Sequence, residues 1–436
     1  MIFHIALFFF LRLTCTSAAA LSHGNAHHAL TQLWDVTPEI DYSDPLYAGW
    51  DPIPDVVNIE IYNGAHEQRT YALHPILYSR GEDVYLIHTS SVIDEDTMGQ
   101  NIWMAHSHDG GYTWTESRPI LPPAILPNQT ATQTFKYYCD LNVQQRAFQS
   151  DAIVEHGGKL FAVAQTLDFW CSGKNVSTQD GSGKYASGRV ARPLHFDGSF
   201  AGDPCWIQQN VWTDYVRYNE TVYGTKYGMR YCEEASAIRE ILELPGSVPA
   251  WSDFQINSGI YAADNNHSME EVTHAVWLED VGLWQRFWRD ISTYNSSHAV
   301  WVEYSHSGRD WFPVVRESYG NQIFETNIPD EISKQYLLRI PNQDLSALIS
   351  NPRFNEGSVR EPLTLATARG RGVQPFQGIG VLRTNASTEI ASDTRGFKAK
   401  GFQYPSATQV GDNLIVAYSE NKQNIWVSIV PVQRLP

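Results

Sequence analysis

One histidine and four arginines have types and positions that suggest chemistry. His74 opens a predicted strand and is followed by a proline, so its side chain is expected at a strand end. Arg289 and Arg360 also fall at the ends of predicted strands, far apart in the sequence. Arg189 and Arg192 are three residues apart, so on one strand only one of them can enter a site, and Arg192 is preferred. Histidine transfers protons and guanidinium groups bind carboxylates, so this set predicts acid–base chemistry beside an acidic ligand.

Short strands recur throughout the chain, and helical periodicity is nearly absent. Runs such as 83–88, 298–304 and 425–430 mix β-branched, aromatic and alternating residues and are bounded by Gly, Asp or Asn. Helix is expected only near 233–244 and 330–336. No Pro/Ser/Gly linker, charge run or low-complexity stretch divides the chain, so we expect one all-β domain over residues 21–436.

One turn sequence occurs twice. The segment SHDGGYTW at 107–114 is typical of a strand, a tight turn and a second strand, and its tryptophan is expected to pack between hairpins. A second copy, SHSGRDW, stands at 305–311. The tryptophans Trp114 and Trp311 are 197 residues apart. That spacing fits three or four sheets of about 50–60 residues each, which predicts the blades of a β-propeller.

The N-terminus predicts export. Residues 1–13 are almost wholly apolar, and the small residues at 17–20 follow in a pattern that signal peptidase accepts. The apolar run of about a dozen residues is too short to span a bilayer, which needs about 20. We therefore expect a signal peptide over residues 1–20 and a secreted, extracellular protein; the alternative is a buried N-terminal helix.

Cysteine and asparagine patterns agree with secretion. Four cysteines in an oxidising compartment suggest two disulfides with three possible pairings, and none has the C-x-x-C spacing of a zinc site. They are Cys139, Cys171, Cys205 and Cys232. The chain also carries six N-x-S/T sequons, more than chance predicts, which favours a glycoprotein. They begin at Asn128, Asn175, Asn219, Asn266, Asn295 and Asn385.

The charge balance excludes some partners. The formal net charge is −17, which argues against binding to nucleic acid or to a membrane surface. An acidic polysaccharide would need positive charge concentrated in one cleft. Nothing in the sequence suggests an oligomer, so a monomer is expected.

The repeated turn resembles the Asp-box of the sialidase superfamily, a folding element on the rim of its propellers. Further segments resemble one branch of that superfamily, the seven-bladed propeller lyases that act beside uronic acids, which include ulvan lyases and the fungal L-rhamnose-α-1,4-D-glucuronate lyases. These segments are HPILY at 74–78, GRVAR at 188–192, DGSF at 197–200, FWRD at 287–290, TNIPD at 326–330, REPL at 360–363 and GFQYPS at 401–406. The resemblance implies seven four-stranded blades with Asp-box hairpins.

The resemblance also implies a site. It places the family's first catalytic histidine at His74, as base or as combined acid and base, with Arg192, Arg289 and Arg360 completing the catalytic set. Four further residues are expected to contact the substrate: His88, Arg189, Asn351 and Tyr404. Some relatives bind calcium on the propeller axis, and no other cofactor is implied.

Two positions depart from the family's pattern. Its second histidine falls about 17 to 20 residues after the first, but this chain has SVID at 91–94. His88 is the nearest histidine and lies early, within a predicted strand. The family's catalytic tyrosine aligns near Phe161, while Tyr185 lies in an insertion. These departures leave the catalytic set incomplete.

Elimination beside a uronic acid defines what the site must supply. The C5 proton is poorly acidic while the adjacent carboxylate keeps its charge, so cationic groups must neutralise that carboxylate. We therefore expect an exo-type lyase that cleaves next to glucuronic acid and releases a terminal sugar, such as rhamnose, from plant glycans. One alternative is a sialidase-type exo-glycosidase, which also uses an arginine clamp but needs a Tyr–Glu nucleophile pair. The other is a sugar-binding propeller without catalysis.

Overall fold

The computed structural model describes most of the chain with gaps. The described residues are 30–92, 94–95, 99–122, 145–169, 184–185, 188–209, 230–246, 260–261, 267–292, 296–309, 311, 323–340, 343–354, 359–388 and 398–436. The predicted signal peptide over residues 1–20 lies outside them. Within these ranges no helix is both long and apolar enough to cross a membrane.

The described strands form five antiparallel sheets. Three have four strands, one has five and one has six. One sheet contains β2 (Tyr71–Arg80), β3 (Asp83–Ser91), β4 (Asn101–Ser107) and β5 (Arg118–Leu121). The next contains β6 (Gln145–His156), β7 (Lys159–Phe169), β9 (Gly188–Leu194) and β10 (Cys205–Gln209), with β8 (Lys184–Tyr185) paired to β7.

The other three sheets follow the same meander. One contains β11 (Ile260–Tyr261), β12 (Ser268–Glu270), β14 (Leu283–Asp290), β15 (Ala299–Ser305) and β16 (Ile323–Pro329), with β13 (Val276–Leu278) paired to β14. Another contains β17 (Tyr336–Ile340), β18 (Leu345–Ser350), β19 (Leu363–Arg369) and β20 (Gly378–Arg383). The last joins β21 (Phe402–Val410), β22 (Asn413–Glu420) and β23 (Asn424–Pro431) to β1 (Val57–Asn63).

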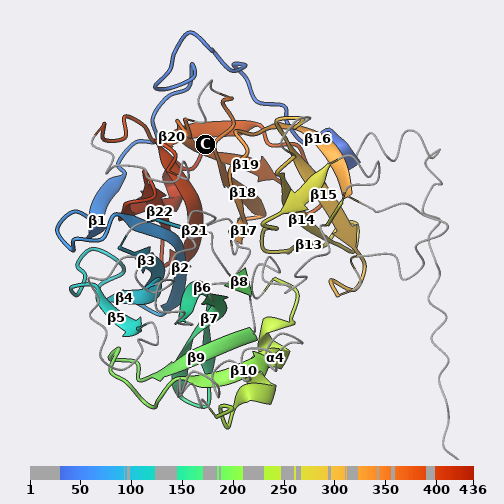
Figure 1. Ribbon diagram of the computed structural model, residues 1–436. Helices are drawn as coiled ribbons and strands as arrows, with labels where there is room; N and C mark the ends of the chain where they lie inside the picture. The colour runs from blue at the N-terminus through green and yellow to red at the C-terminus, as the bar shows by residue number, and fades with distance from the viewer. Residues whose placement is uncertain are drawn as a thin grey trace, which may run out of the picture.

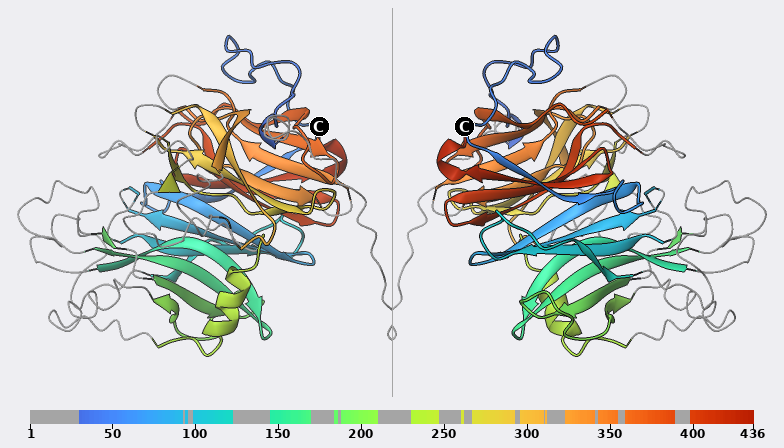
Figure 2. Two further views of the ribbon diagram at one scale, coloured as in Figure 1. Left: turned by 90° about the vertical axis from the view of Figure 1, so that its right-hand side faces the viewer. Right: turned by 90° about the vertical axis from the view of Figure 1, so that its left-hand side faces the viewer.

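The sheets are arranged as a β-propeller. Figure 1 shows them around a common centre, with β2, β6, β17 and β21 nearest to it. The side views in Figure 2 show the red, blue and green sheets stacked in that order, which agrees with the contacts of β2 with both β21 and β6. The N-terminal strand β1 pairs with β23, so both parts of the chain complete one blade. This pairing joins the N-terminal and C-terminal parts of the described chain in one sheet, in which β1 is an edge strand.

The propeller prediction is confirmed, but the predicted number of seven blades is wrong. The described residues form five sheets. The 197 residues between Trp114 and Trp311 span two steps from sheet to sheet, from the β2–β5 sheet to the β11–β16 sheet, and not three or four. The spacing argument assumed about 50–60 residues for each blade, and the described sheets do not follow that spacing.

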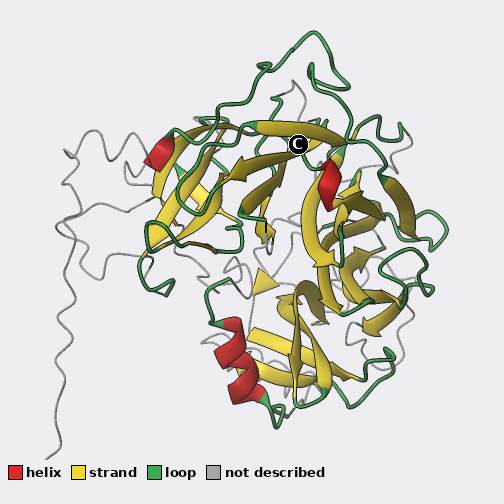
Figure 3. Cartoon of the chain, turned by 180° about the vertical axis from the view of Figure 1, so that it is seen from behind, coloured by secondary structure: helices red, strands yellow, loops and turns green. Residues whose placement is uncertain are grey.

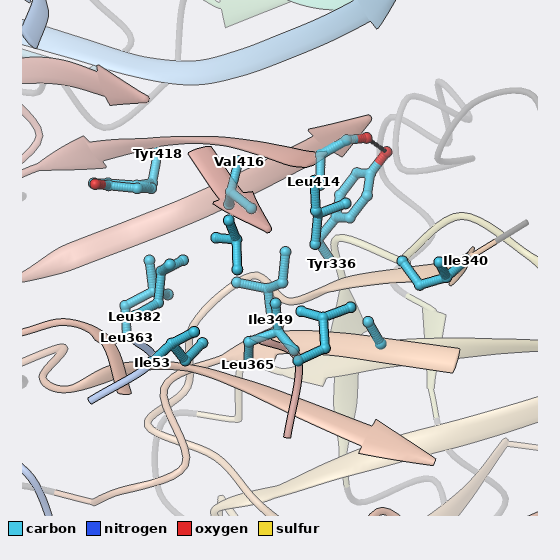
Figure 4. Packing of buried hydrophobic residues seen from close by; sticks show 14 of the residues in the cluster. Ile53, Tyr336, Ile340, Ile349, Leu363, Leu365, Leu382, Leu414, Val416 and Tyr418 are labelled. Carbon is cyan, nitrogen blue, oxygen red and sulfur yellow. Dashed lines mark hydrogen bonds between the residues drawn. The ribbon is translucent and has the colours of Figure 1, made fainter. Parts of the chain in front are cut away.

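Neighbouring sheets bury apolar side chains between their faces. Figure 4 shows one such layer, in which Ile349, Leu363 and Leu365 of the β17–β20 sheet pack with Leu414 and Val416 of the last sheet. Each of these five residues has an exposed fraction of 0%. Both faces of a blade are covered by its neighbours, so the strands read as nearly continuous apolar runs.

The two repeated turns have matching hydrogen bonds. In the first, the Gly111 amide donates to Ser107 Oγ at 2.9 Å and Trp114 Nε1 donates to the Gly111 carbonyl at 2.7 Å. In the second, Gly308 N donates to Ser305 Oγ at 2.9 Å, and the following tryptophan donates to the Gly308 carbonyl at 2.7 Å. Both glycines have positive φ, 96° and 69°, a conformation that favours glycine. The turns therefore stabilise two hairpins in the same way.

A helix and a disulfide support the β6–β10 sheet from outside. The helix α4 (Ala235–Leu242), red at the rim in Figure 3, packs Ile238 against the sheet. Cys205 and Cys232 form a disulfide, whereas Cys139 and Cys171 lie outside the described residues. A short 3₁₀ helix, η2 (Val432–Arg434), follows β23. The helix expected near 233–244 is therefore confirmed, while the segment 330–336 is not helical.

One predicted glycosylation site lies in the described part of the chain. Asn385 is exposed and follows β20, so a glycan could be attached there without disturbing the core. The other five sequons, at Asn128, Asn175, Asn219, Asn266 and Asn295, lie outside the described residues.

Candidate functional site

Polar and charged side chains gather around His74 and Tyr404. We call this group the inner-strand cluster. Its members lie in β2, β6, β14 and β21 or in the segments after β12 and before β17 and β19, and they are His74, Gln149, Asp151, Glu271, Arg289, Lys334, Arg360 and Tyr404. Local irregularities of the backbone help to present them. Pairing shifts its register across His74 in β2, Asp151 in β6 and Tyr404 in β21. Such bulges re-aim side chains and are frequent beside active sites.

His74 and Tyr404 form the centre of this cluster. Their rings meet edge to face with centroids 5.0 Å apart. Both residues precede a proline and have positive φ, 53° and 56°. Gln149 Nε2 lies 2.9 Å from His74 Nε2 and donates to it. The imidazole is 2% exposed, and burial lowers the pKa of His74 to about 3. His74 is therefore neutral at ordinary pH.

Arg289 links a carboxylate to the tyrosine. Its Nη1 lies 2.5 Å from Glu271 Oε2 and 3.1 Å from the Tyr404 hydroxyl, to which it donates. Burial raises the pKa of Tyr404 well above its usual value, and Glu271 adds to this shift while Arg289 opposes it. Burial also opposes ionisation of Glu271, but Arg289 and Lys334 outweigh it and lower the pKa of this carboxyl group. The cluster thus combines a protonated phenol with an ionised carboxylate.

Arg360 is a buried cation with neutral partners. Its Nη1 donates to Gln403 Oε1 and its Nη2 to the Ile332 carbonyl at 3.3 Å, while its guanidinium lies 5.6 Å from the Tyr404 ring centroid. The residue is 7% exposed. Across the described ranges, no carboxylate forms an ion pair with it, and its Nε has no hydrogen-bond partner. Glu271 and Glu95 act on this guanidinium electrostatically without an ion pair in the described residues, and its hydrogen bonds go to neutral oxygens, so this position favours an anionic ligand.

Two lysines add positive charge around the same ring. Lys334 Nζ and Lys422 Nζ lie 5.9 and 5.8 Å from the Tyr404 centroid. Lys422 is paired with Glu95 at 2.5 Å. With Arg289 and Arg360 these lysines concentrate cations at one place in a chain whose net charge is −17. Arg289 and Lys422 are ion-paired with Glu271 and Glu95, so the cluster holds charges of both signs.

The structure brings together four of the eight predicted site residues. His74, Arg289, Arg360 and Tyr404 surround one point, as the contacts above show. Arg189 approaches the same region from β9, because its Nε lies 2.8 Å from Asp151 Oδ2.

Arg192 lies elsewhere. Its guanidinium stacks 3.9 Å from the Phe200 centroid, on the side of β9 opposite to Arg189. Burial there lowers the pKa of Arg192, and the nearby charges are Asp203 and Arg118. The alternation of side chains along a strand is as expected, but the preference for Arg192 over Arg189 is reversed.

His88 and Asn351 have structural partners. His88 is 0% exposed within β3; its Nε2 contacts Ser117 Oγ at 3.2 Å and its ring lies 4.6 Å from that of Tyr62. It therefore does not replace the missing second histidine. Asn351 Nδ2 donates to the carbonyl of Arg360 at 3.1 Å and to that of Phe402 at 3.0 Å, so it braces the backbone beside the cluster.

Sequence reasoning missed Gln149, Asp151, Glu271 and Lys334. Glu270 and Glu271 are adjacent and point apart, since Glu270 is exposed and Glu271 is 6% exposed, and for that reason only Glu271 enters the cluster. Gln149 and Asp151 lie within β6, and Glu271 and Lys334 lie just outside β12 and β17, so no strand-start pattern marks these four residues in the sequence.

No metal site with three or more His, Cys, Asp or Glu ligands occurs in the described part of the chain. The expected calcium on the propeller axis stays a prediction, because backbone carbonyls alone would hold it.

Comparisons with known proteins support the fold. No protein-family model matches the chain, and no curated protein sequence does. Among solved structures, one described as a sialidase superposes with a TM-score of 0.59 at 19% identity, over 92% of this chain and 35% of the sialidase. The chain thus spans about a third of that protein's length. A Trypanosoma rangeli sialidase in complex with sialic acid gives a TM-score of 0.47 at 11% identity, over 88% of this chain and 60% of that one. The first of these similarities shows that the chain has the fold of a sialidase β-propeller, and at this identity it shows the fold alone.

Proposed function

We propose that this chain is a secreted carbohydrate-active enzyme that cleaves by β-elimination next to a glucuronic acid. In the sharpest form of the proposal it is an exo-type lyase that releases terminal rhamnose from plant glycans. The observation that carries it is Arg360, a buried guanidinium without a carboxylate partner in the described ranges, next to a neutral histidine and a protonated tyrosine. The apolar run and small residues at 1–20 support secretion.

The protonation states suit an elimination. Arg360 and Arg289 would bind the substrate carboxylate and stabilise the charge that develops when the C5 proton leaves. Neutral His74 would accept that proton, since its imidazole is not already charged. The electron pair of the C5–H bond forms the C4=C5 double bond as the C4–O bond breaks. Tyr404 would donate its phenolic proton to the leaving oxygen and recover one from solvent, while His74 would release the C5 proton to solvent.

A sialidase-type hydrolase is the second candidate. Tyr404 and Glu271 both contact the same Arg289 Nη1, which places a tyrosine and a carboxylate near each other, as a Tyr–Glu nucleophile pair requires. A nucleophilic tyrosine would donate its hydroxyl proton to the carboxylate of Glu271. In the structure the Tyr404 hydroxyl instead accepts a hydrogen bond from Arg289. The third candidate is a sugar-binding propeller without catalysis.

One assay separates the three candidates. The protein is incubated with gum arabic, or with a rhamnosyl-glucuronate disaccharide, while the ultraviolet absorbance of unsaturated uronate is recorded. Rising absorbance supports elimination. New reducing ends without absorbance support hydrolysis, and binding without either product supports a lectin. His74→Gln should abolish the absorbance; unchanged turnover in this variant would contradict the proposed base.

A further inference from the structure

A histidine pair lies at the opposite end of the β2–β5 sheet. His106 is in β4 and His108 follows this strand, two residues on, so both side chains project from the same face. Their Nε2 atoms are 3.0 Å apart. His108 contacts Asp83 at the start of β3. Thr89 lies six residues further along β3 and pairs with Leu73, the residue before His74. The pair therefore lies about 20 Å from the inner-strand cluster at the rise per residue of a strand.

Both imidazoles are held by their second nitrogen. Asp83 Oδ1 lies 2.7 Å from His108 Nδ1, and Thr115 Oγ1 lies 3.3 Å from His106 Nδ1. A carboxylate on Nδ1 fixes the tautomer in which Nε2 carries a lone pair, the arrangement found behind metal-binding histidines. The His106 ring also lies close to Gly198, where an added Cβ would come 3.0 Å from Nδ1. The pair is thus oriented before any ligand arrives.

We propose that His106 and His108 form a binding site for one divalent transition-metal ion, Cu²⁺ in preference to Zn²⁺, completed by water. Without metal, one Nε2–H donates to the other Nε2. Metal binding would replace that proton, which His106 would move to Nδ1, where it donates to Thr115 Oγ1. The His108 side chain is 59% exposed, so the ion can reach it from solvent.

The geometry accounts for the choice of metal. Metal–imidazole bonds of about 2.0–2.1 Å to two nitrogens 3.0 Å apart give an N–metal–N angle of about 95°. This angle matches neighbouring positions of square-planar Cu²⁺ and is smaller than the tetrahedral angle that Zn²⁺ prefers. Cu²⁺ also binds nitrogen ligands most tightly among the divalent ions of its row.

The test uses the full chain and Cu²⁺ alone. Calorimetric titration and electron paramagnetic resonance should show one Cu²⁺ with two nitrogen ligands that is absent from the double variant His106→Gln/His108→Gln. The matched control, His66→Gln, removes an exposed histidine elsewhere and should keep this ion. Asp83→Asn should weaken binding about 10-fold, because it removes the carboxylate behind His108.

The opposite outcomes are equally clear. If the double variant binds Cu²⁺ with the stoichiometry, affinity and spectrum of the unmodified protein, the two imidazoles share only a proton and the proposal is overturned. Comparison of thermal unfolding curves shows whether a variant has lost the ion or the fold. Turnover in the lyase assay should be the same with and without Cu²⁺, which keeps this site separate from the proposed function.

Discussion

His74 and Tyr404 occupy equivalent positions in neighbouring sheets, and their rings meet at right angles with centroids 5.0 Å apart. Each is a non-glycine residue of positive φ, each precedes a proline, and each lies at a register shift of an innermost strand. A left-handed backbone at such residues costs about 1–3 kcal/mol and is retained where the surroundings enforce it. Two neighbouring blades thus use the same local irregularity to bring the side chains of His74 and Tyr404 together.

Tyr404→Phe tests the role of the phenol. It removes the hydroxyl that accepts from Arg289 and keeps the ring between His74 and the cations. If the phenol protonates the leaving oxygen, kcat should fall by about 10²–10⁴, which is the usual contribution of a general acid. Tyr418→Phe is the matched control, because this buried hydroxyl bonds to Ser428 in the same sheet. The control should lower the unfolding temperature and leave kcat unchanged; equal losses of kcat would contradict the proposed acid.

Arg360→Gln tests the carboxylate clamp. The variant keeps a hydrogen-bonding side chain of similar reach and removes the buried charge, so kcat/KM for the uronide should fall about 10²–10³-fold. Arg192→Gln, whose parent residue stacks on Phe200 away from the cluster, should change kcat/KM by less than about twofold. Initial rates over a range of substrate concentrations separate the two. A larger effect at Arg192 would move the site to the outer part of the β6–β10 sheet.

Features that depend on residues adjacent in the sequence were predictable, and features that depend on which strands pair with one another were not. The turns at 107–114 and 305–311 have glycines where positive φ is needed, so the hairpins could be recognised. The number of blades could not, because it depends on the lengths of connections between sheets. The segment 330–336 has a helix-like pattern, yet its residues are extended or irregular, and this conformation presents Lys334 beside Tyr404.

The candidate site shows the same division. His74 and Tyr404 were identified through the resemblance to the lyase family, and His74 also through its place before a proline. The prediction that His74 opens a strand is wrong, because it is the fourth residue of β2. The choice between Arg189 and Arg192 required the pairing of β9 with β7, which decides the side that each arginine takes. Glu271 and Asp151 required knowledge of where the innermost strands are interrupted. A sequence with no aligned relatives contains no direct record of those interruptions.

Buried histidines should destabilise the protein in acid. Burial lowers the pKa of both His74 and His88 to about 3, from 6.5. Their contribution to the free energy of unfolding is complete above pH 6.5 and is lost as the pH falls from 6.5 towards 3. In this range the unfolded chain binds protons on these histidines and the folded state does not. Each histidine adds a slope of about 1 kcal/mol per pH unit in this window. Urea denaturation at several pH values should show a smaller slope for His88→Gln than for His66→Gln; equal slopes would contradict the burial argument.

Asp330 should make the protein less stable as the pH rises, which is opposite to the effect of the buried histidines. Burial raises the pKa of this carboxyl group to about 7, so the folded state holds a proton that the unfolded chain has released. Its stability contribution is complete below about pH 4 and declines by about 1 kcal/mol per pH unit as the pH rises to 7. Asp330→Asn keeps an oxygen for the Ser333 amide, which donates to Oδ2 at 3.2 Å. This variant should be more stable than the unmodified protein at pH 8 in thermal unfolding; lower stability there would show that the carboxylate is needed in its charged form.

The disulfide between Cys205 and Cys232 should stabilise the outer edge of the β6–β10 sheet. It joins residues 27 apart and connects the edge strand β10 to the segment that leads into α4. Closing a loop of this length lowers the entropy of the unfolded chain, which stabilises the fold by about 3 kcal/mol. The double variant Cys205→Ser/Cys232→Ser should therefore unfold at a lower temperature than the unmodified protein. Adding a reductant should lower the unfolding temperature of the unmodified protein further than that of the variant. The disulfide lies outside the inner-strand cluster, so kcat below the unfolding transition should be the same in both proteins. A loss of kcat at low temperature would mean that this edge helps to hold Asp151 and Arg189 in place.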